Sequence, residues 1–333
     1  MSLRELFRTL KDNPSGHTYT ALRIQGRNNA YVAVNSAGQP ALLVETDSRA
    51  TAPSLRTARV SLRPSEEFNV FIDGKTVTGR AFHTLVCESS DQVEVEYFLI
   101  LLEAFLASQV ESEIVGDNLF SFFRSMIKLF SVTSVRNLDS ERQGLWGELF
   151  VMRQVRGYRC WAPYWHSEVT RLFDFSTFKK RVEVKTTVGT QRIHHFSHNQ
   201  IWEAEGEQIV IASLLLMEDD AGLSLRELVR ECRKALHGTP DYLKLEFAVR
   251  CAGMEDPSLD GPRFNESQAD KKLAWFKSTD TPHFLVPEPP GVSETKYKVN
   301  LTAATPLSAD ELDRWLNDWT QMSQLAEVRS CLQ

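Results

Sequence analysis

The 333-residue sequence has no long apolar run, and its richest apolar stretch, residues 97–107, is interrupted by Glu103. A membrane helix needs about 20 consecutive, predominantly apolar residues. The first residues also lack the apolar segment and small-residue cleavage site of a secretory signal. We therefore expect a soluble, cytoplasmic protein that does not interact with a membrane.

Cysteine is scarce, and nucleotide-binding signatures are absent. The five cysteines are scattered and include no C-x-x-C pair, so they predict neither a zinc ribbon nor a disulfide framework. The phosphate-binding loop G-x-x-x-x-G-K-[ST] is missing, as is an obvious glycine motif of a methyltransferase. Any dependence on ATP would therefore require another protein chain.

The net charge of −6 is low for a protein that binds nucleic acid, but the charge is unevenly distributed. Residues 121–200 contain thirteen Lys or Arg and six Asp or Glu, so this segment carries +7 and the rest of the chain −13. A basic segment is typical of a surface that contacts phosphate. Ordinary solvated charge is the alternative that the composition leaves open.

Two β-strand patterns form a predicted hairpin. Residues 171–177 and 180–188 both carry the alternation and the β-branched or aromatic residues of strands. A two-residue loop at 178–179 would place Asp174 directly opposite Glu183. Because a slip of one residue would send these side chains to opposite faces, the alternation favours this register.

The polar face of this hairpin carries Asp174, Glu183 and Lys185. Two facing carboxylates repel each other, which raises the pKa of one of them unless a cation lies between. Mg²⁺ prefers oxygen ligands and needs only one or two protein carboxylates. It would polarise a phosphodiester and activate water, while Lys185 would orient the water or offset charge growing on the phosphate. A solvated cross-strand ion pair is the alternative.

A predicted helix over residues 139–156, with Ser140 as its N-cap, carries a further acid. Glu148 lies among apolar residues, close to Gly144 and Gly147. A helical glycine costs about 1 kcal/mol relative to alanine, so the pair is expected where the backbone closely approaches another segment. The pattern leaves open whether Glu148 points into a site or to solvent.

Four motifs of the central region resemble the PD-(D/E)XK nuclease superfamily, and more narrowly a nuclease family of bacterial restriction and phage-defence clusters. They are Gly144-Leu145-Trp146-Gly147-Glu148-Leu149, Phe173-Asp174-Phe175, Val182-Glu183-Val184-Lys185-Thr186-Thr187 and His194-His195-Phe196-Ser197. The resemblance is clearest over residues 140–250. Phe173 stands where many members have proline.

This resemblance implies a metal-dependent endodeoxyribonuclease, in which Glu148, Asp174, Glu183 and Lys185 are catalytic. Asp174, Glu183 and Glu148 would hold Mg²⁺, with Mn²⁺ as a substitute. DNA would be contacted by basic residues of the +7 segment and by polar residues after the hairpin: Lys179, Lys180, Arg181, Arg192, His195, Ser197 and Gln200. The alternative is a catalytically silent nuclease fold that binds DNA or assembles a defence complex.

Three histidines at positions 194, 195 and 198 also suggest a zinc site, but no fourth ligand lies at a usual spacing. A support role beside Lys185 is the interpretation that the resemblance favours. A polar loop that begins a helix is the alternative.

The order of strand and helix patterns predicts an α/β (α+β) protein with a restriction-endonuclease-like core, a mixed sheet flanked by helices. We expect an N-terminal β-rich domain over residues 1–115, the nuclease core over 116–250, and a C-terminal extension over 251–333 with a late strand and an amphipathic helix. The expected partner is DNA. In a defence complex, an ATPase or methyltransferase subunit would be a further partner. A homodimer or larger assembly is expected because cutting both strands often brings two sites together.

Overall fold

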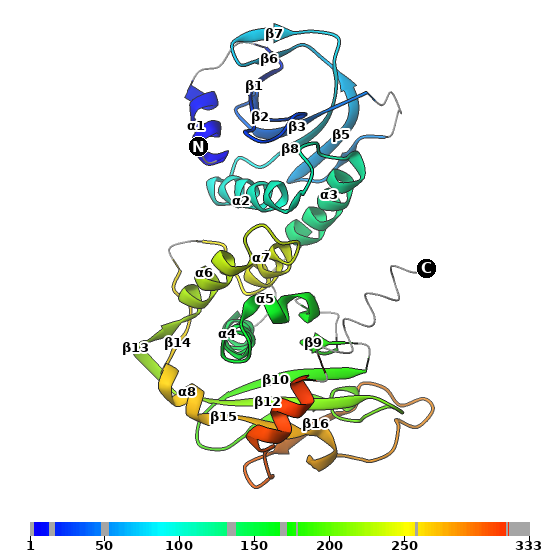
Figure 1. Cartoon of the computed structure of the whole chain (residues 1–333), viewed down its shortest axis with the longest axis vertical. Coiled ribbons are helices and arrows are strands. Elements are labelled where there is room, and N and C mark those ends of the chain that lie inside the picture. The colour runs from blue at the N-terminus through cyan, green and yellow to red at the C-terminus, as the bar shows by residue number, and fades with distance from the viewer. Residues whose placement is uncertain are drawn as a thin grey trace. The chain divides into compact units, whose positions relative to one another are not determined.

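The computed structural model describes residues 3–12, 17–47, 53–131, 138–166, 172–177, 179–256, 259–317 and 319. The chain forms two compact units (Figure 1). The first comprises Met1–Ser134 and His237–Glu246, and the second comprises Val135–Leu236 and Phe247–Gln333. Over the described ranges, no helix combines the length and apolar character needed to cross a membrane.

The first unit is built on one eight-stranded sheet, in which only β1 and β6 pair in parallel. Its order is β4-β5-β8-β3-β2-β1-β6-β7. The strands are β1 (Tyr19–Arg23), β2 (Ala30–Asn35), β3 (Pro40–Thr46), β4 (Leu55–Arg56), β5 (Val60–Glu67), β6 (Val70–Ile72), β7 (Lys75–Val77) and β8 (Ala81–Cys87). Alternate positions of the central strands, such as Tyr31, Leu43 and Phe82, form a buried core.

Three helices complete the described part of this unit: α1 (Leu3–Asp12), α2 (Gln92–Ser108) and α3 (Gly116–Ser131). Asp91 caps α2 by accepting a hydrogen bond from the Val93 backbone N–H at 2.7 Å, which satisfies one of the donors left free at a helix start. Figure 1 shows α1 and α2 lying against the curved sheet.

The second unit contains a four-stranded mixed sheet, in the order β15-β12-β10-β9, and two strand pairs, β11–β16 and β13–β14. The strands are β9 (Phe175–Ser176), β10 (Lys180–Val188), β11 (Ile193–Ser197), β12 (Gln208–Leu216), β13 (Glu218–Ser224), β14 (Arg263–Phe264), β15 (Leu273–Lys277) and β16 (Lys296–Asn300). Strands β10 and β12 are parallel, whereas β9 and β15 are antiparallel to their neighbours.

The helices of this unit are α4 (Leu138–Gln154), α5 (Tyr158–Trp161), α6 (Leu225–Leu236) and α8 (Glu266–Lys272). Helix α7 (Tyr242–Cys251) carries residues of both units. Short 3₁₀ turns are η1 (Ala162–Tyr164), η2 (His198–Gln200) and η3 (Ser278–Asp280). Helix α4 packs on β10 and α6. The mixed sheets flanked by helices, with a β-rich N-terminal part, confirm the predicted fold class.

The predicted hairpin register is confirmed where the structure describes it. Phe175 pairs with Val182 and Ser176 with Arg181, and the Thr177 N–H donates to the Lys180 carbonyl at 2.9 Å. Residue 178 of the predicted loop lies outside the described residues. The predicted helix cap is wrong, because α4 begins at Leu138 and Ser140 lies inside the helix.

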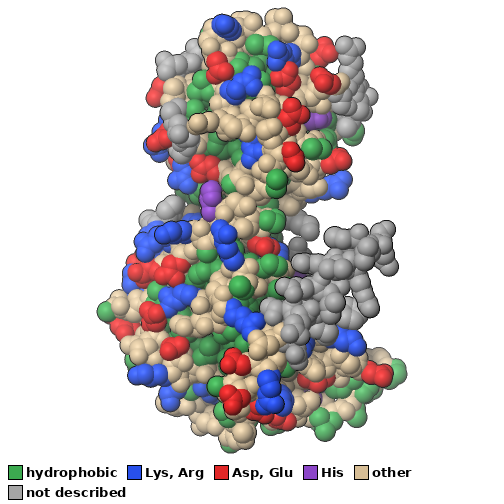
Figure 2. Space-filling view, viewed as in Figure 1, with side chains coloured by type: hydrophobic (Ala, Val, Ile, Leu, Met, Phe, Trp, Pro, Cys, Tyr) green, Lys and Arg blue, Asp and Glu red, His purple; other side chains and the backbone are tan. Residues whose placement is uncertain are grey.

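Acidic and basic side chains are interspersed on the faces of the two units that Figure 2 shows, with no large area of a single sign. The basic segment of the sequence therefore does not form a separate basic area on the face that Figure 2 shows.

Candidate active site

Helix α4 lies unusually close to the central strand β10. A methyl group built on Gly147 would meet the Thr186 Cγ2 at 2.3 Å and the Val184 Cγ1 at 3.5 Å. Gly147 therefore permits a close approach, as the sequence predicted for this glycine pair. Gly144 has no atom within 4 Å of the same position, so close packing does not explain that glycine.

The hairpin brings Asp174, Glu183 and Lys185 together. Because side chains alternate along a strand, Val184 and Thr186 face α4, whereas Glu183 and Lys185 point to the other side of β10. The Lys185 Nζ lies 2.7 Å from the Glu183 Oε1. Asp174 is fixed from the neighbouring strand, because its Oδ2 accepts a hydrogen bond from the Val184 N–H at 2.7 Å.

Gln200 holds this group from the turn η2. Its Nε2 donates to the Glu183 Oε1 at 2.7 Å and to the Leu172 carbonyl at 3.1 Å. Its Oε1 accepts from the Ser197 N–H at 3.0 Å and from the Lys185 Nζ at 3.5 Å. One amide thus orients both members of the ion pair, which agrees with the support role that the sequence suggested for this segment.

Burial dominates the electrostatics of the site. Desolvation and the neighbouring Asp174 raise the pKa of Glu183 to about 8, although Lys185 lowers it. Desolvation also raises the pKa of Asp174 to about 6, against the Val184 N–H and Lys185. Desolvation lowers the pKa of Lys185, but Glu183, Asp174 and Glu148 outweigh it and raise that pKa, so the ammonium stays charged. Strongly shifted groups in one place are typical of functional sites.

Glu148 approaches from α4 and is held by a residue that the sequence analysis missed. The Trp165 Nε1 donates to the Glu148 Oε2 at 2.6 Å, and the Trp165 indole is fully buried. Desolvation and Asp174 raise the pKa of Glu148 well above its ordinary value, and Trp165 opposes this shift. Only the density of aromatic residues before the hairpin could have indicated such a partner.

The carboxylate oxygens are suitable ligands for a divalent cation, but few of them lie together. The Glu183 Oε2 is buried and has no hydrogen-bond partner, which leaves one oxygen that a cation would satisfy. Within the described ranges, however, no group of three or more Asp, Glu, His or Cys side chains is arranged to hold an ion. Asp174 and Glu183 would therefore be a two-carboxylate set, which is sufficient for Mg²⁺ when water and phosphate supply the other ligands.

The residues predicted to contact DNA occupy very different environments. Lys180 is only 4% exposed, and its Nζ donates to the Trp315 carbonyl at 2.8 Å. Arg181 forms an ion pair with Glu207 at 3.0 Å. Arg192 donates to the Ser213 carbonyl at 2.6 Å. Only Lys179 and His195 of this set are exposed. Ser197 and Gln200 are partly buried, and the Gln200 Oε1 contacts the Lys185 Nζ.

The three histidines do not assemble a zinc site. His194 is buried and shares a 2.7 Å hydrogen bond with the Ser213 Oγ, His198 contacts the Tyr297 hydroxyl at 2.5 Å, and His195 is exposed on the opposite face of β11. These separate environments agree with the support role and not with binding of one zinc ion by all three histidines.

Burial of His194 makes the stability of the protein depend on pH. Desolvation, with a smaller effect of Lys185, lowers the pKa of His194 to about 3, whereas an unfolded histidine titrates near pH 6.5. The unfolded state therefore binds more protons in this window, and the free energy of unfolding falls as the pH drops from about 6.5 towards 3, by at most about 1.4 kcal/mol per pH unit. Lowering the pH from 7.5 to 5.5 in urea unfolding should therefore cost wild type more stability than it costs His194→Gln, because the opposite contributions of Glu183 and Asp174 are common to both proteins. The exposed control His195→Gln should retain the wild-type dependence.

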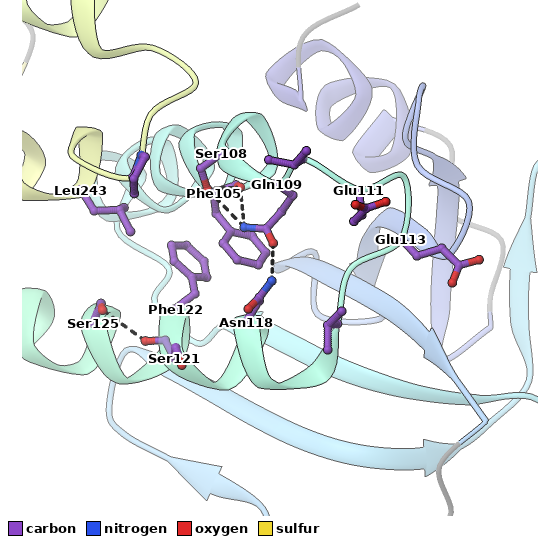
Figure 3. Close-up of a pocket in the computed structure, with 13 residues that line it drawn as sticks. Phe105, Ser108, Gln109, Glu111, Glu113, Asn118, Ser121, Phe122, Ser125 and Leu243 are labelled. Carbon is purple, nitrogen blue, oxygen red and sulfur yellow. Dashed lines mark hydrogen bonds between the residues drawn. The ribbon is translucent and has the colours of Figure 1, made fainter. Parts of the chain in front are cut away.

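Two cavities among the described residues are lined by residues other than the candidate catalytic ones. Figure 3 shows a cavity of about 410 Å³ between α2 and α3 of the first unit, where the rings of Phe105 and Phe122 stack at 4.4 Å and the Asn118 Nδ2 donates to the Gln109 Oε1 at 2.8 Å. A second cavity, of about 520 Å³, is lined in part by Lys277 and Trp315 of the second unit. The candidate site is a cluster of side chains in mutual contact.

A mixed sheet with an acid–x–lysine strand, an aspartate on its hairpin partner and a glutamate on the covering helix defines a protein of the PD-(D/E)XK class. A family model described as "Putative PD-(D/E)XK family member, (DUF4420)" matches residues 3–302. The chain belongs to this family, which supports the superfamily named by the sequence motifs and indicates a nuclease. No curated protein and no solved structure matches the chain.

Proposed function

We propose that this protein is an Mg²⁺-dependent endodeoxyribonuclease that acts in a bacterial restriction or phage-defence system. The observation that carries the proposal is the buried group formed by Asp174, Glu183 and Lys185. Two neighbouring carboxyl groups and a charged ammonium, in a member of this family, are groups that metal-dependent phosphodiester hydrolysis can use. Their burial in a stable sheet preorganises them, which is how such sites stabilise charge in a transition state.

In this proposal Asp174 and Glu183 would hold Mg²⁺, which would polarise the scissile phosphate and lower the pKa of a bound water. Lys185 offsets negative charge that develops on the phosphate or orients the attacking water. Gln200 keeps the Glu183 carboxylate and the Lys185 ammonium aligned through its contacts to both. Glu148, held by Trp165, contributes from the α4 side by organising the cation or the water.

Incubation of purified protein with supercoiled plasmid tests the proposal. Wild type is expected to nick or cut the plasmid with Mg²⁺ or Mn²⁺ but not with EDTA. Asp174→Asn keeps the shape of the side chain and an oxygen that can accept the Val184 N–H, but it removes the negative charge. This variant should therefore fold like wild type and lose cleavage. Equal cleavage in EDTA, or by Asp174→Asn, would contradict metal-dependent hydrolysis at this site.

One observation favours a second candidate, a silent nuclease fold that binds DNA within a larger complex. The Glu183 Oε1 already contacts both Lys185 and Gln200, and the described residues contain no three-acid ligand group. If this state were permanent, the protein would bind DNA tightly and leave it intact with every divalent cation. Equilibrium binding measured beside the plasmid assay separates this candidate from the first.

The proposal extends to the assembly. The two strands of a duplex run in opposite directions, and cutting both often brings two catalytic sites together. We therefore propose that a dimer forms on DNA, and that any ATPase or methyltransferase acts from another subunit. Analytical ultracentrifugation with a short duplex in EDTA tests this: two protein chains per duplex support a dimer, and one per duplex is against it.

A further inference from the structure

Strands β11 and β16 form a two-stranded ribbon whose two faces differ in chemistry. The register pairs Ile193 with Asn300, His195 with Lys298, and Ser197 with Lys296. Directly paired residues of antiparallel strands lie on the same face. One face, the outer face, therefore carries Ile193, His195, Ser197, Lys296, Lys298 and Asn300.

The inner face of the ribbon is attached to the candidate active site. The Lys185 Nζ lies 5.1 Å from the centre of the Phe196 ring, and His194 contacts Ser213 on β12. Phe196 and Val299 are also buried in a common apolar core with Ile211 and Phe276. These contacts fix the position of the ribbon relative to the reactive ammonium.

The outer face is basic and exposed. His195, Lys296, Lys298 and Asn300 are all exposed, and the outer-face residues include no acid. Among the described residues, no ion pair is recorded for Lys296 or Lys298. On the loop before β16, the Glu288 Oε1 accepts a hydrogen bond from the Thr295 N–H at 2.8 Å, and Glu294 is exposed two positions before Lys296.

We propose that the outer face of the β11–β16 ribbon contacts the phosphate backbone of duplex DNA, mainly through Lys296 and Lys298. The proposal rests on the proposed function and deepens it, because it names a surface of the same unit that would hold the duplex. Residues two apart on a strand are separated by about 6.7 Å, so these ammonium groups can contact successive phosphates of one DNA strand.

The shape of the ribbon supports this partner. A two-stranded ribbon is an element that a DNA groove accommodates. The inner face contacts Lys185, so the outer face points away from that residue, and a duplex bound there would reach the candidate site past the edge of the ribbon. Charge complementarity and the shape of the ribbon therefore favour DNA over a protein partner for this face.

Binding measured without cleavage tests the proposal. Fluorescence anisotropy with a labelled 30-base-pair duplex in EDTA, at several salt concentrations, gives both affinity and salt dependence. The double variant Lys296→Ala/Lys298→Ala should bind about tenfold more weakly at low salt. The negative slope of log K against log salt should become about 2 less steep, because two phosphate contacts are lost. Lys296→Arg/Lys298→Arg should restore both values.

A matched control removes the same charge elsewhere. Lys75 on β7 and Lys234 on α6 are exposed and belong to elements that do not pair with the ribbon, so Lys75→Ala/Lys234→Ala should retain the wild-type slope. Thermal unfolding should be unchanged in all three variants because these side chains are exposed. A wild-type slope in the ribbon variant, an equal loss in the control, or no duplex binding by wild type would overturn the proposal.

These outcomes are distinguishable from failure of the proposed function. Loss of binding in the ribbon variant, with no plasmid cleavage by wild type in Mg²⁺ or Mn²⁺, would support the DNA-binding face and reject hydrolysis. Metal-dependent cleavage by wild type, together with unchanged binding by the ribbon variant, would support hydrolysis and reject the face.

Discussion

Replacing Lys185 with alanine is expected to reduce plasmid cleavage by about 10²- to 10³-fold or more, the loss typical when one group that stabilises a transition state is removed. The ammonium is charged, lies 2.7 Å from Glu183 and is fixed over Phe196. No other cation among the described residues is recorded in contact with Glu183. Initial rates of nicking in Mg²⁺, measured against wild type, give the size of the effect.

The fold should survive this substitution, which makes the loss of activity interpretable. Glu183 is 3% exposed, and removal of Lys185 would raise its pKa further, so at neutral pH the carboxyl group takes up a proton instead of remaining as an unpaired buried charge. Circular dichroism and urea unfolding should therefore show a folded protein. Lys271→Ala, which removes an exposed lysine on α8 of the same unit, is the matched control. Retained cleavage by highly purified Lys185→Ala protein would exclude the proposed mechanism.

Replacing Gly147 with alanine is expected to destabilise the protein by about 1–3 kcal/mol, the usual cost of adding an atom to a closely packed core. The new methyl group would lie 2.3 Å from the Thr186 Cγ2, so α4, β10 or the Thr186 side chain must move. A shift of α4 would also displace Glu148, the next residue. Urea unfolding gives the change in stability, and the plasmid assay gives the effect on the site.

Two variants test the cause. Gly144→Ala lies on the same helix with no atom within 4 Å, and it should stabilise the protein by up to about 1 kcal/mol through helix propensity. Adding Thr186→Ser to Gly147→Ala removes the Cγ2 that clashes and keeps the Oγ to which the Gln143 Nε2 donates at 3.0 Å. The double variant should recover part of the lost stability. Equal effects of the two glycine substitutions would contradict the close approach.

The sequence could predict the hairpin because its information is local. Alternation on both strands and a short loop permit one register that separates Phe175 and Val182 from Glu183 and Lys185, and the observed pairs have that register. The two glycines of α4 look alike in the sequence, yet only Gly147 is required by a neighbour. That difference depends on Thr186, which belongs to another element and which helix propensity does not include.

Charge was the less informative pattern, because position along the chain does not give exposure. Lys180 belongs to the basic segment but is buried against Trp315, 135 residues away. The pairing of His195 with Lys298 joins segments more than 100 residues apart, and nothing near either residue indicates the other. Trp165 was missed for a similar reason, since its contact with Glu148 depends on how α4 packs.

The division of the chain affects how the protein is made. The first unit contains Met1–Ser134 but also His237–Glu246, and the buried Tyr97 hydroxyl donates to the Glu246 carbonyl at 2.6 Å. A ribosome therefore synthesises about one hundred further residues before this unit can close. Until then the apolar surface of α2 stays exposed, where chaperones can bind it or it can pack against the wrong partner. For the same reason, a fragment that stops at Ser134 should be less stable than its share of the sheet suggests.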